Sequence, residues 1–206
     1  GSYAGISAAT QLARARRRVL VIDAGQRRNR FAQHSHGFLT QDGTDASVIA
    51  ATGRAQLLQY PNVTWAEGLA AGVRTQDGDF AVTLADGSRF HGRTLVLATG
   101  VTDELPPVEG LAERWGRSVF HCPYCHGYEL DAGQIGVLAV GPLSMHHALM
   151  LPDWGTVTFF LNDAFAPDAD QLAALAARGV RIERSAVARI AGTADVVLVD
   201  GRVLPM

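Results

Sequence analysis

Two cysteines, Cys122 and Cys125, are the residues of this 206-residue chain best suited to redox chemistry, and the chain has no others. Two thiols at this spacing can close a disulfide across one helical turn, and a helix amino end there favours the reactive thiolate. Pro123 suits the first position of such a helix. His126 follows directly, and a histidine can carry a proton near neutral pH. The motif therefore offers a nucleophile, a resolving partner and a base.

Three other interpretations compete for this motif. With His121 it contains four potential zinc ligands, but adjacent residues do not easily close one tetrahedron, and no second ligand pair follows at zinc spacing. Cys-x-x-Cys-His also matches c-type haem attachment, which an export signal would normally accompany. Inert buried thiols would not need the paired spacing. We favour redox chemistry and predict no metal ligands. We leave out His36, His146 and His147, because isolated histidines are more often structural.

Glycines at the start of the sequence indicate a nucleotide site. Gly1, Ser2, Ala4 and Gly5 precede a helical pattern, and the apolar strand that follows ends at Asp23, eighteen residues after Gly5. In dinucleotide-binding folds glycines let the backbone approach a pyrophosphate, and a carboxylate about 20 residues further on holds a ribose hydroxyl. Ser2 stands where a middle glycine is usual, and the strand expected before the glycines is missing. The alternative is a cloning remnant at Gly1 and Ser2, with Gly5 merely packing the helix.

A second glycine turn supports the first. Ala98, Thr99 and Gly100 end an apolar run that starts at Thr94, and we predict this run to be a strand. Ligands of open α/β sheets lie at the carboxyl ends of their strands, so both turns are expected to serve one site.

The remaining sequence alternates between helical and strand-like patterns. Alternation of this kind predicts an α/β fold with parallel sheets, here two Rossmann-like nucleotide-binding units with a small antiparallel β meander. The predicted domains are residues 1–108 and residues 109–206, the second carrying the cysteine motif. We predict helices at 5–18, 45–60, 141–150 and 168–178, strands at 19–23, 63–65, 135–140, 156–161 and 180–182, a meander over 70–93 and a long loop at 25–43.

Charge and hydropathy limit the classes of partner that we expect the protein to bind. A formal net charge of −2 gives no positive electrostatic potential that would attract nucleic acid or an anionic membrane. No run approaches the roughly 20 apolar residues that span a bilayer, and no charged-then-apolar leader opens the sequence. We therefore predict a cytoplasmic protein that binds neither nucleic acid nor membrane.

These motifs, in this order, resemble the thioredoxin-reductase family of FAD-dependent pyridine nucleotide-disulfide oxidoreductases, in a branch similar to natural-product dithiol oxidases. The resemblance implies that the two glycine turns bind FAD, that Cys122 exchanges with a substrate sulfur, and that Cys125 faces the flavin. In well-known members an acid follows the second cysteine, and His126 holds that place here. The implied catalytic residues are Cys122, Cys125 and His126, and the implied FAD-binding residues are Gly1, Ser2, Ala4, Gly5, Asp23, Ala98, Thr99 and Gly100.

Two departures from the family matter. Its carboxyl-terminal FAD segment should follow the second unit but lies outside this sequence, so we expect the sequence to be a piece of a longer protein. Where the pyridine-nucleotide fingerprint belongs, the chain has Gly141 followed by Pro142, and no arginine pair follows the next strand. NADPH binding is therefore in doubt, and NAD(P)H stays open as a cofactor.

The predicted function is an FAD-dependent thiol–disulfide oxidoreductase, with oxygen as one electron acceptor. The expected partners are a dithiol or disulfide substrate, either a small molecule or a thioredoxin-like protein, and a second copy in a homodimer. An NAD(P)H-dependent disulfide reductase is one alternative. A non-catalytic flavin or redox-sensing module is another, from a different class.

Overall fold

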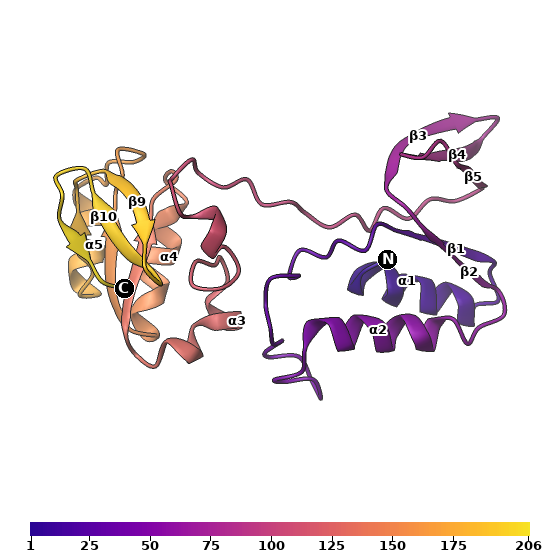
Figure 1. Cartoon of the computed structure of the whole chain (residues 1–206), viewed down its shortest axis with the longest axis horizontal. Coiled ribbons are helices and arrows are strands. Elements are labelled where there is room, and N and C mark those ends of the chain that lie inside the picture. Colours follow the sequence, from indigo (N-terminus) through magenta and orange to yellow (C-terminus); the bar gives the residue numbers. More distant parts are fainter. The chain divides into compact units, whose positions relative to one another are not determined.

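The computed structural model describes residues 1–206, except for the side chain of Gln76, and its elements form two compact units. One unit contains Gly1–Ser35 and Gly43–Thr102, and the other contains His36–Asp42 and Asp103–Met206. Each unit combines a parallel sheet and helices with an antiparallel sheet of its own (Figure 1). The predicted α/β class, with two Rossmann-like units, is confirmed.

The first unit is built on two parallel strands and two helices that pack together (Figure 1). The second helix starts where Asp45 accepts a hydrogen bond from the Ser47 backbone N–H at 2.6 Å, a common way to satisfy a helix amino end. The elements are α1 (Tyr3–Arg14), β1 (Val19–Asp23), α2 (Ala46–Leu57) and β2 (Val63–Glu67). Their buried core consists of Ile6, Ala9, Ala13, Val21 and Leu57.

The predicted meander is confirmed as an antiparallel sheet of three strands in the order β3-β4-β5. Its first turn places Asp77 and Gly78 at φ 52° and 84°, the left-handed pair that matches the twist of a tight hairpin. The strands are β3 (Ala70–Gln76), β4 (Asp79–Leu84) and β5 (Arg89–Gly92).

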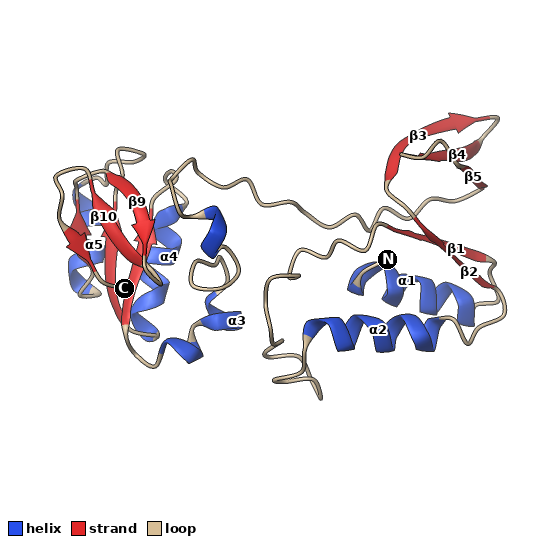
Figure 2. Cartoon of the chain, viewed as in Figure 1, coloured by secondary structure: helices blue, strands red, loops and turns tan.

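The strand predicted from Thr94 to Gly100 is not formed. This segment carries no strand in Figure 2, and Val96 and Leu97 are 54% and 73% exposed. An extended segment becomes a strand only when a neighbouring backbone supplies hydrogen bonds, and none of the strands that the structure describes pairs with this one. The prediction of a strand over this run was therefore wrong.

The second unit contains a parallel sheet in the order β6-β7-β8. Its central strand is buried on both faces, as expected for a strand between helices, with Phe159 fully buried. Ala148 and Leu175, one from each flanking helix, are also fully buried. The elements are β6 (Gln134–Leu138), α4 (Ser144–Met150), β7 (Thr156–Phe160), α5 (Ala169–Ala177) and β8 (Arg181–Glu183), all close to the predicted positions.

A second antiparallel sheet ends the chain and was not predicted. It has the order β11-β10-β9 and packs Val187, Val196 and Leu198 against Phe160 of the parallel sheet. The strands are β9 (Val187–Ala191), β10 (Asp195–Leu198) and β11 (Val203–Leu204). Arg202, next to β11, joins this sheet to the parallel sheet through a 2.7 Å ion pair with Glu183 of β8, and it also lies 2.8 Å from Asp200 in the turn before β11. Among the helices that the structure describes, none is both long and apolar enough to cross a membrane.

Candidate functional site

The two cysteines belong to a single helical turn, α3 (Pro123–His126): Cys122 caps its amino end and Cys125 lies within it. Cys122 is extended, with φ −100° and ψ 114°, and Pro123 occupies the first turn as predicted, where its missing N–H costs nothing. The two sulfur atoms lie 2.8 Å apart, and both side chains are partly buried. The pair can therefore open and close a disulfide with little movement of the backbone.

Trp154 and Gly127 hold this turn in place. Gly127 donates its N–H to the Pro123 carbonyl at 2.6 Å and closes the turn. A Cβ on Gly127 would lie 2.5 Å from the Pro123 oxygen and 2.5 Å from Trp154 Cδ1, so only glycine fits. The Trp154 ring also meets the Tyr124 ring edge-on, with centroids 5.2 Å apart. The indole thus packs against both ends of the cysteine turn.

His126, the predicted base, is partly buried beside the Phe120 ring, with ring centroids 4.8 Å apart. Burial lowers its pKa because the charged imidazolium loses water. Glu129 opposes this shift, and His36 adds to it. A lowered pKa keeps His126 neutral at physiological pH, so its imidazole can accept a proton from a thiol.

The short segment His36–Asp42 belongs to this unit and brings His36 close to the motif. His36 Nε2 lies 3.5 Å from Glu129 Oε1, and His36 Nδ1 lies 3.5 Å from Asp42 Oδ1. The same Asp42 oxygen accepts the Gly37 N–H at 2.9 Å, which fixes the turn of the segment. Glu129 and His36 were not predicted as site residues, because only the tertiary contact joins positions so far apart in the chain.

Three further histidines gather beside the motif. The His121 and His147 ring centroids are 5.0 Å apart, and those of His146 and His147 are 5.7 Å apart. Burial lowers the pKa of His147, and both neighbours lower it further. Among the residues that the structure describes, no group of three histidine, cysteine, aspartate or glutamate side chains is placed to hold a metal ion.

In the first unit, segments far apart in sequence meet at the amino end of α1. The Gly1 amino nitrogen lies 3.5 Å from Asp23 Oδ1, and a Cβ on Gly1 would overlap the Asp23 side chain. Gly5 faces Ala98, whose Cβ would lie 3.5 Å from a Cβ added to Gly5. Thus β1, the start of α1 and Ala98 lie together.

This meeting point suits a dinucleotide. Ser2 precedes α1 and makes no side-chain cap, so the N–H groups of the first turn are not taken by it. Such N–H groups bind phosphate, and Asp23 at the end of β1 suits a ribose hydroxyl. Ala4, Thr99 and Gly100 are exposed. The predicted residues fit the adenosine and pyrophosphate of a cofactor such as FAD.

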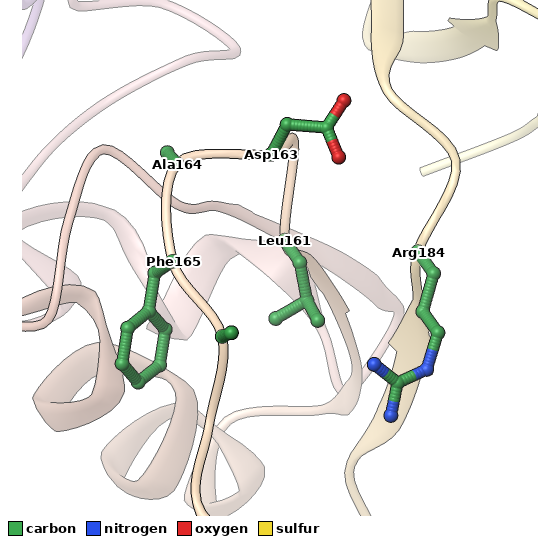
Figure 3. Close-up of a pocket in the computed structure, with 6 residues that line it drawn as sticks. Leu161, Asp163, Ala164, Phe165 and Arg184 are labelled. Atoms are coloured by element: carbon green, nitrogen blue, oxygen red, sulfur yellow. The ribbon is translucent and has the colours of Figure 1, made fainter.

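The second unit has an open hollow of about 360 Å³ at the carboxyl ends of β7 and β8 (Figure 3). Leu161 and Phe165 give it apolar walls, and Asp163 and Arg184 give it one charge of each sign. The Arg184 side chain extends away from the Asp163 carboxylate (Figure 3). Arg184 could attract the 2′-phosphate that distinguishes NADPH from NADH, but the Asp163 carboxylate in the same hollow would repel it, so the lining offers no matched cationic clamp for this phosphate.

The whole chain, residues 1–206, matches the family described as pyridine nucleotide-disulphide oxidoreductase, and the chain belongs to this family. It is similar to thioredoxin reductase tcpT from Claviceps purpurea, at 39% identity over 146 residues, which are 69% of this chain and 46% of that protein. The chain spans about half the length of the curated relatives it matches.

Solved structures agree with this assignment. An oxidoreductase from Agrobacterium tumefaciens has 58% identity and a TM-score of 0.96, covering 100% of this chain and 70% of that one. A protein named HlmI has 37% identity and a TM-score of 0.91, covering 99% of this chain and 67% of that one. The resemblance to the thioredoxin-reductase family is confirmed by the family match and by these relatives.

Proposed function

We propose that the protein is an FAD-dependent thiol–disulfide oxidoreductase that works as a dithiol oxidase with oxygen as the final electron acceptor. The observation that supports this most is the 2.8 Å approach of the Cys122 and Cys125 sulfurs directly before His126, in a chain that belongs to a disulphide oxidoreductase family. In this proposal Cys122, Cys125 and His126 are the catalytic residues.

The exchange starts with the cysteine pair oxidised. A thiolate of the substrate attacks Cys122 Sγ, the disulfide to Cys125 breaks, and Cys125 leaves as a thiolate. The second substrate thiolate then attacks the first substrate sulfur, the bond from that sulfur to Cys122 Sγ breaks, and Cys122 is released. The substrate gains one disulfide and loses two electrons and two protons. The electrons stay on the reduced pair. Neutral His126 takes up one proton, and Cys122 takes the other and leaves as a thiol.

The FAD site is proposed for the amino end of α1 and the segments around it. Gly1, Ser2, Ala4 and Gly5 would approach the pyrophosphate, and Asp23 would hold a ribose hydroxyl. The segment of Ala98, Thr99 and Gly100 would contact the same cofactor. When bound, FAD would accept the electron pair from the reduced cysteines and pass it to oxygen. Residues 1–108 would form the FAD-binding part and residues 109–206 the NAD(P)-like part.

NADPH has no part in the proposed exchange, because the Asp163 carboxylate would repel its 2′-phosphate and Pro142 lacks a backbone N–H donor. The substrate class is proposed as a dithiol, either a small molecule or a thioredoxin-like protein. The competing reductase would run the exchange in the opposite direction and would need a pyridine nucleotide as electron donor.

Oxygen uptake tests the proposal on the intact protein. With dithiothreitol as the probe dithiol, we expect catalytic oxygen consumption by the wild type and none by Cys122→Ser or Cys125→Ser. A second assay supplies NADPH or NADH with an aromatic disulfide. Fast turnover in this second assay, with no oxygen uptake in the first, would show that the protein is a disulfide reductase and not a dithiol oxidase. Negligible turnover in both assays, with a flavin spectrum unchanged in Cys125→Ser, would support a redox-sensing module instead.

A further inference from the structure

Arg27 of the first unit is partly buried, and it follows the end of β1 at Asp23 by four residues. Its Nε is shielded from solvent and has no hydrogen-bond partner within the described part of the chain, residues 1–206 without the Gln76 side chain. A buried donor without an acceptor is costly, so folded proteins normally supply one. We therefore expect the acceptor for this N–H to come from a bound molecule.

The turn that contains Arg27 is tied to the amino end of α1. Within the turn, Arg30 donates its backbone N–H to the Arg27 carbonyl at 3.3 Å. Tyr3, the first residue of α1, donates its hydroxyl to the Ala46 carbonyl at 2.9 Å and accepts the Asn29 amide N–H at 3.1 Å. One hydroxyl thus joins α1, the turn and the first residue of α2.

Arg30, in the same turn, already uses its guanidinium within the turn. Its Nη1 donates to the Arg27 carbonyl at 3.0 Å, and its Cζ lies 4.3 Å from the centroid of the Phe31 ring. Arg30 is also exposed. Arg27 is therefore the better candidate of the two for binding an anion.

The charge of the proposed FAD site favours a cation at this place. Of the residues assigned to that site, Asp23 alone has a charged side chain, and its charge is negative. The diphosphate of FAD adds further negative charge, whereas the N–H groups at the start of α1 supply only a partial positive charge. A guanidinium matches a phosphate with two parallel N–H groups, so an arginine suits this role better than a lysine.

From these observations we infer that Arg27 binds the diphosphate of FAD, and that Tyr3 is a positioning residue that holds the turn of Arg27 at the amino end of α1. The inference rests on the proposed function, because it uses the FAD site proposed there. It adds two residues to those that the glycine pattern indicates.

Variants of Arg27 separate charge from shape. Arg27→Gln removes the charge, and we expect FAD and ADP to bind on the order of 10-fold to 100-fold more weakly. Adenosine carries no phosphate, so its affinity should not change. Arg27→Lys keeps the charge without the planar fork and should lose less affinity than Arg27→Gln. An arginine with only a structural role would affect all three ligands alike.

Tyr3→Phe removes the hydroxyl and keeps the ring. We expect weaker FAD binding than in the wild type, with a smaller loss than in Arg27→Gln, because the arginine itself remains. Since Tyr3 acts through Arg27, adding Arg27→Gln to Tyr3→Phe should cost less affinity than adding it to the wild type. Fully additive losses would contradict the positioning role.

Isothermal titration calorimetry of the intact protein, freed of flavin, gives the dissociation constants of FAD, ADP and adenosine for each variant. Urea unfolding checks that each variant is folded. Arg74→Gln is the matched control, because Arg74 is an exposed arginine of β3 and its replacement changes the net charge equally. This control should bind all three ligands like the wild type.

The outcomes separate the inference from the proposed function. Unchanged FAD and ADP binding in Arg27→Gln, or an equal loss for adenosine, would refute the inference, and dithiothreitol oxidation by the wild type would then leave the proposed function standing. A selective loss of FAD and ADP binding, in a protein whose wild type oxidises no dithiol, would refute the proposed oxidase and leave the role of Arg27. A wild type that binds no FAD would refute both.

Discussion

Replacing Gly127 by alanine should disturb the cysteine turn. The backbone is no obstacle, because Gly127 has φ −70° and ψ −31°, where alanine is favoured over glycine by about 0.5–1 kcal/mol. The added Cβ would lie 2.5 Å from the Pro123 oxygen, 2.5 Å from Trp154 Cδ1 and 2.9 Å from Trp154 Cγ. Overpacking of this kind costs typically about 1–3 kcal/mol. We expect a net loss on the order of 1–2 kcal/mol.

The Pro123 oxygen belongs to the turn itself, so the turn must shift and change the approach of the two sulfurs. Urea unfolding followed by tryptophan fluorescence measures the stability, and the rate at which the reduced pair closes its disulfide measures the geometry. In a Trp154→Ala background the loss from Gly127→Ala should shrink but persist, because the Pro123 contact remains. Gly72→Ala is the matched control, since a Cβ there meets nothing within 4 Å. Stability and closure rate unchanged within error in Gly127→Ala would refute the reasoning.

Three further changes test the rest of the fold. Gly53→Ala, inside α2, should stabilise the first unit by about 0.5–1 kcal/mol, because its Cβ would make ordinary contact with Ile6 at 3.4 Å; a loss in urea midpoint would contradict this. Leu57→Ala should cost about 2–5 kcal/mol, since Leu57 is fully buried, and a loss below about 1 kcal/mol would show that the core collapses around the gap. Asp200 has its pKa lowered to about 2 by hydrogen bonds from Arg202, so the native state favours its charged form. That contribution is present above the ordinary value of 3.8 and is lost as pH falls towards 2; stability measured over this range should therefore fall less steeply in Asp200→Asn than in the wild type.

Local patterns predicted most of the fold. The run ending at Asp23 gave β1 with its observed bounds, and the Asp77-Gly78 pair located the hairpin turn, because both depend on neighbouring residues. The run from Thr94 failed as a strand because pairing depends on a partner that composition does not reveal. The sheet β9 to β11 was missed although Gly192 and Gly201, both with positive φ, marked its turns. Those strands are short, and their apolar residues do not alternate strictly.

The residues of the candidate site likewise fall into those that the sequence predicted and those that it did not. Cys122, Cys125 and His126 are adjacent in sequence, so spacing alone was enough to propose them. His36 was set aside as an isolated histidine, and its place beside Glu129 follows from the path of the chain rather than from its neighbours in sequence. The pKa of His126 likewise depends on burial, which no motif states.

The path of the chain has a practical consequence. Because His36–Asp42 packs with Asp103–Met206, no single cut separates the two units. A fragment starting at Asp103 would contain both sulfurs and lack His36 and its supporting carboxylate. Recombination between homologous genes at that junction would likewise join a cysteine turn from one parent to a histidine segment from the other, so substitutions at the two places are expected to be inherited together.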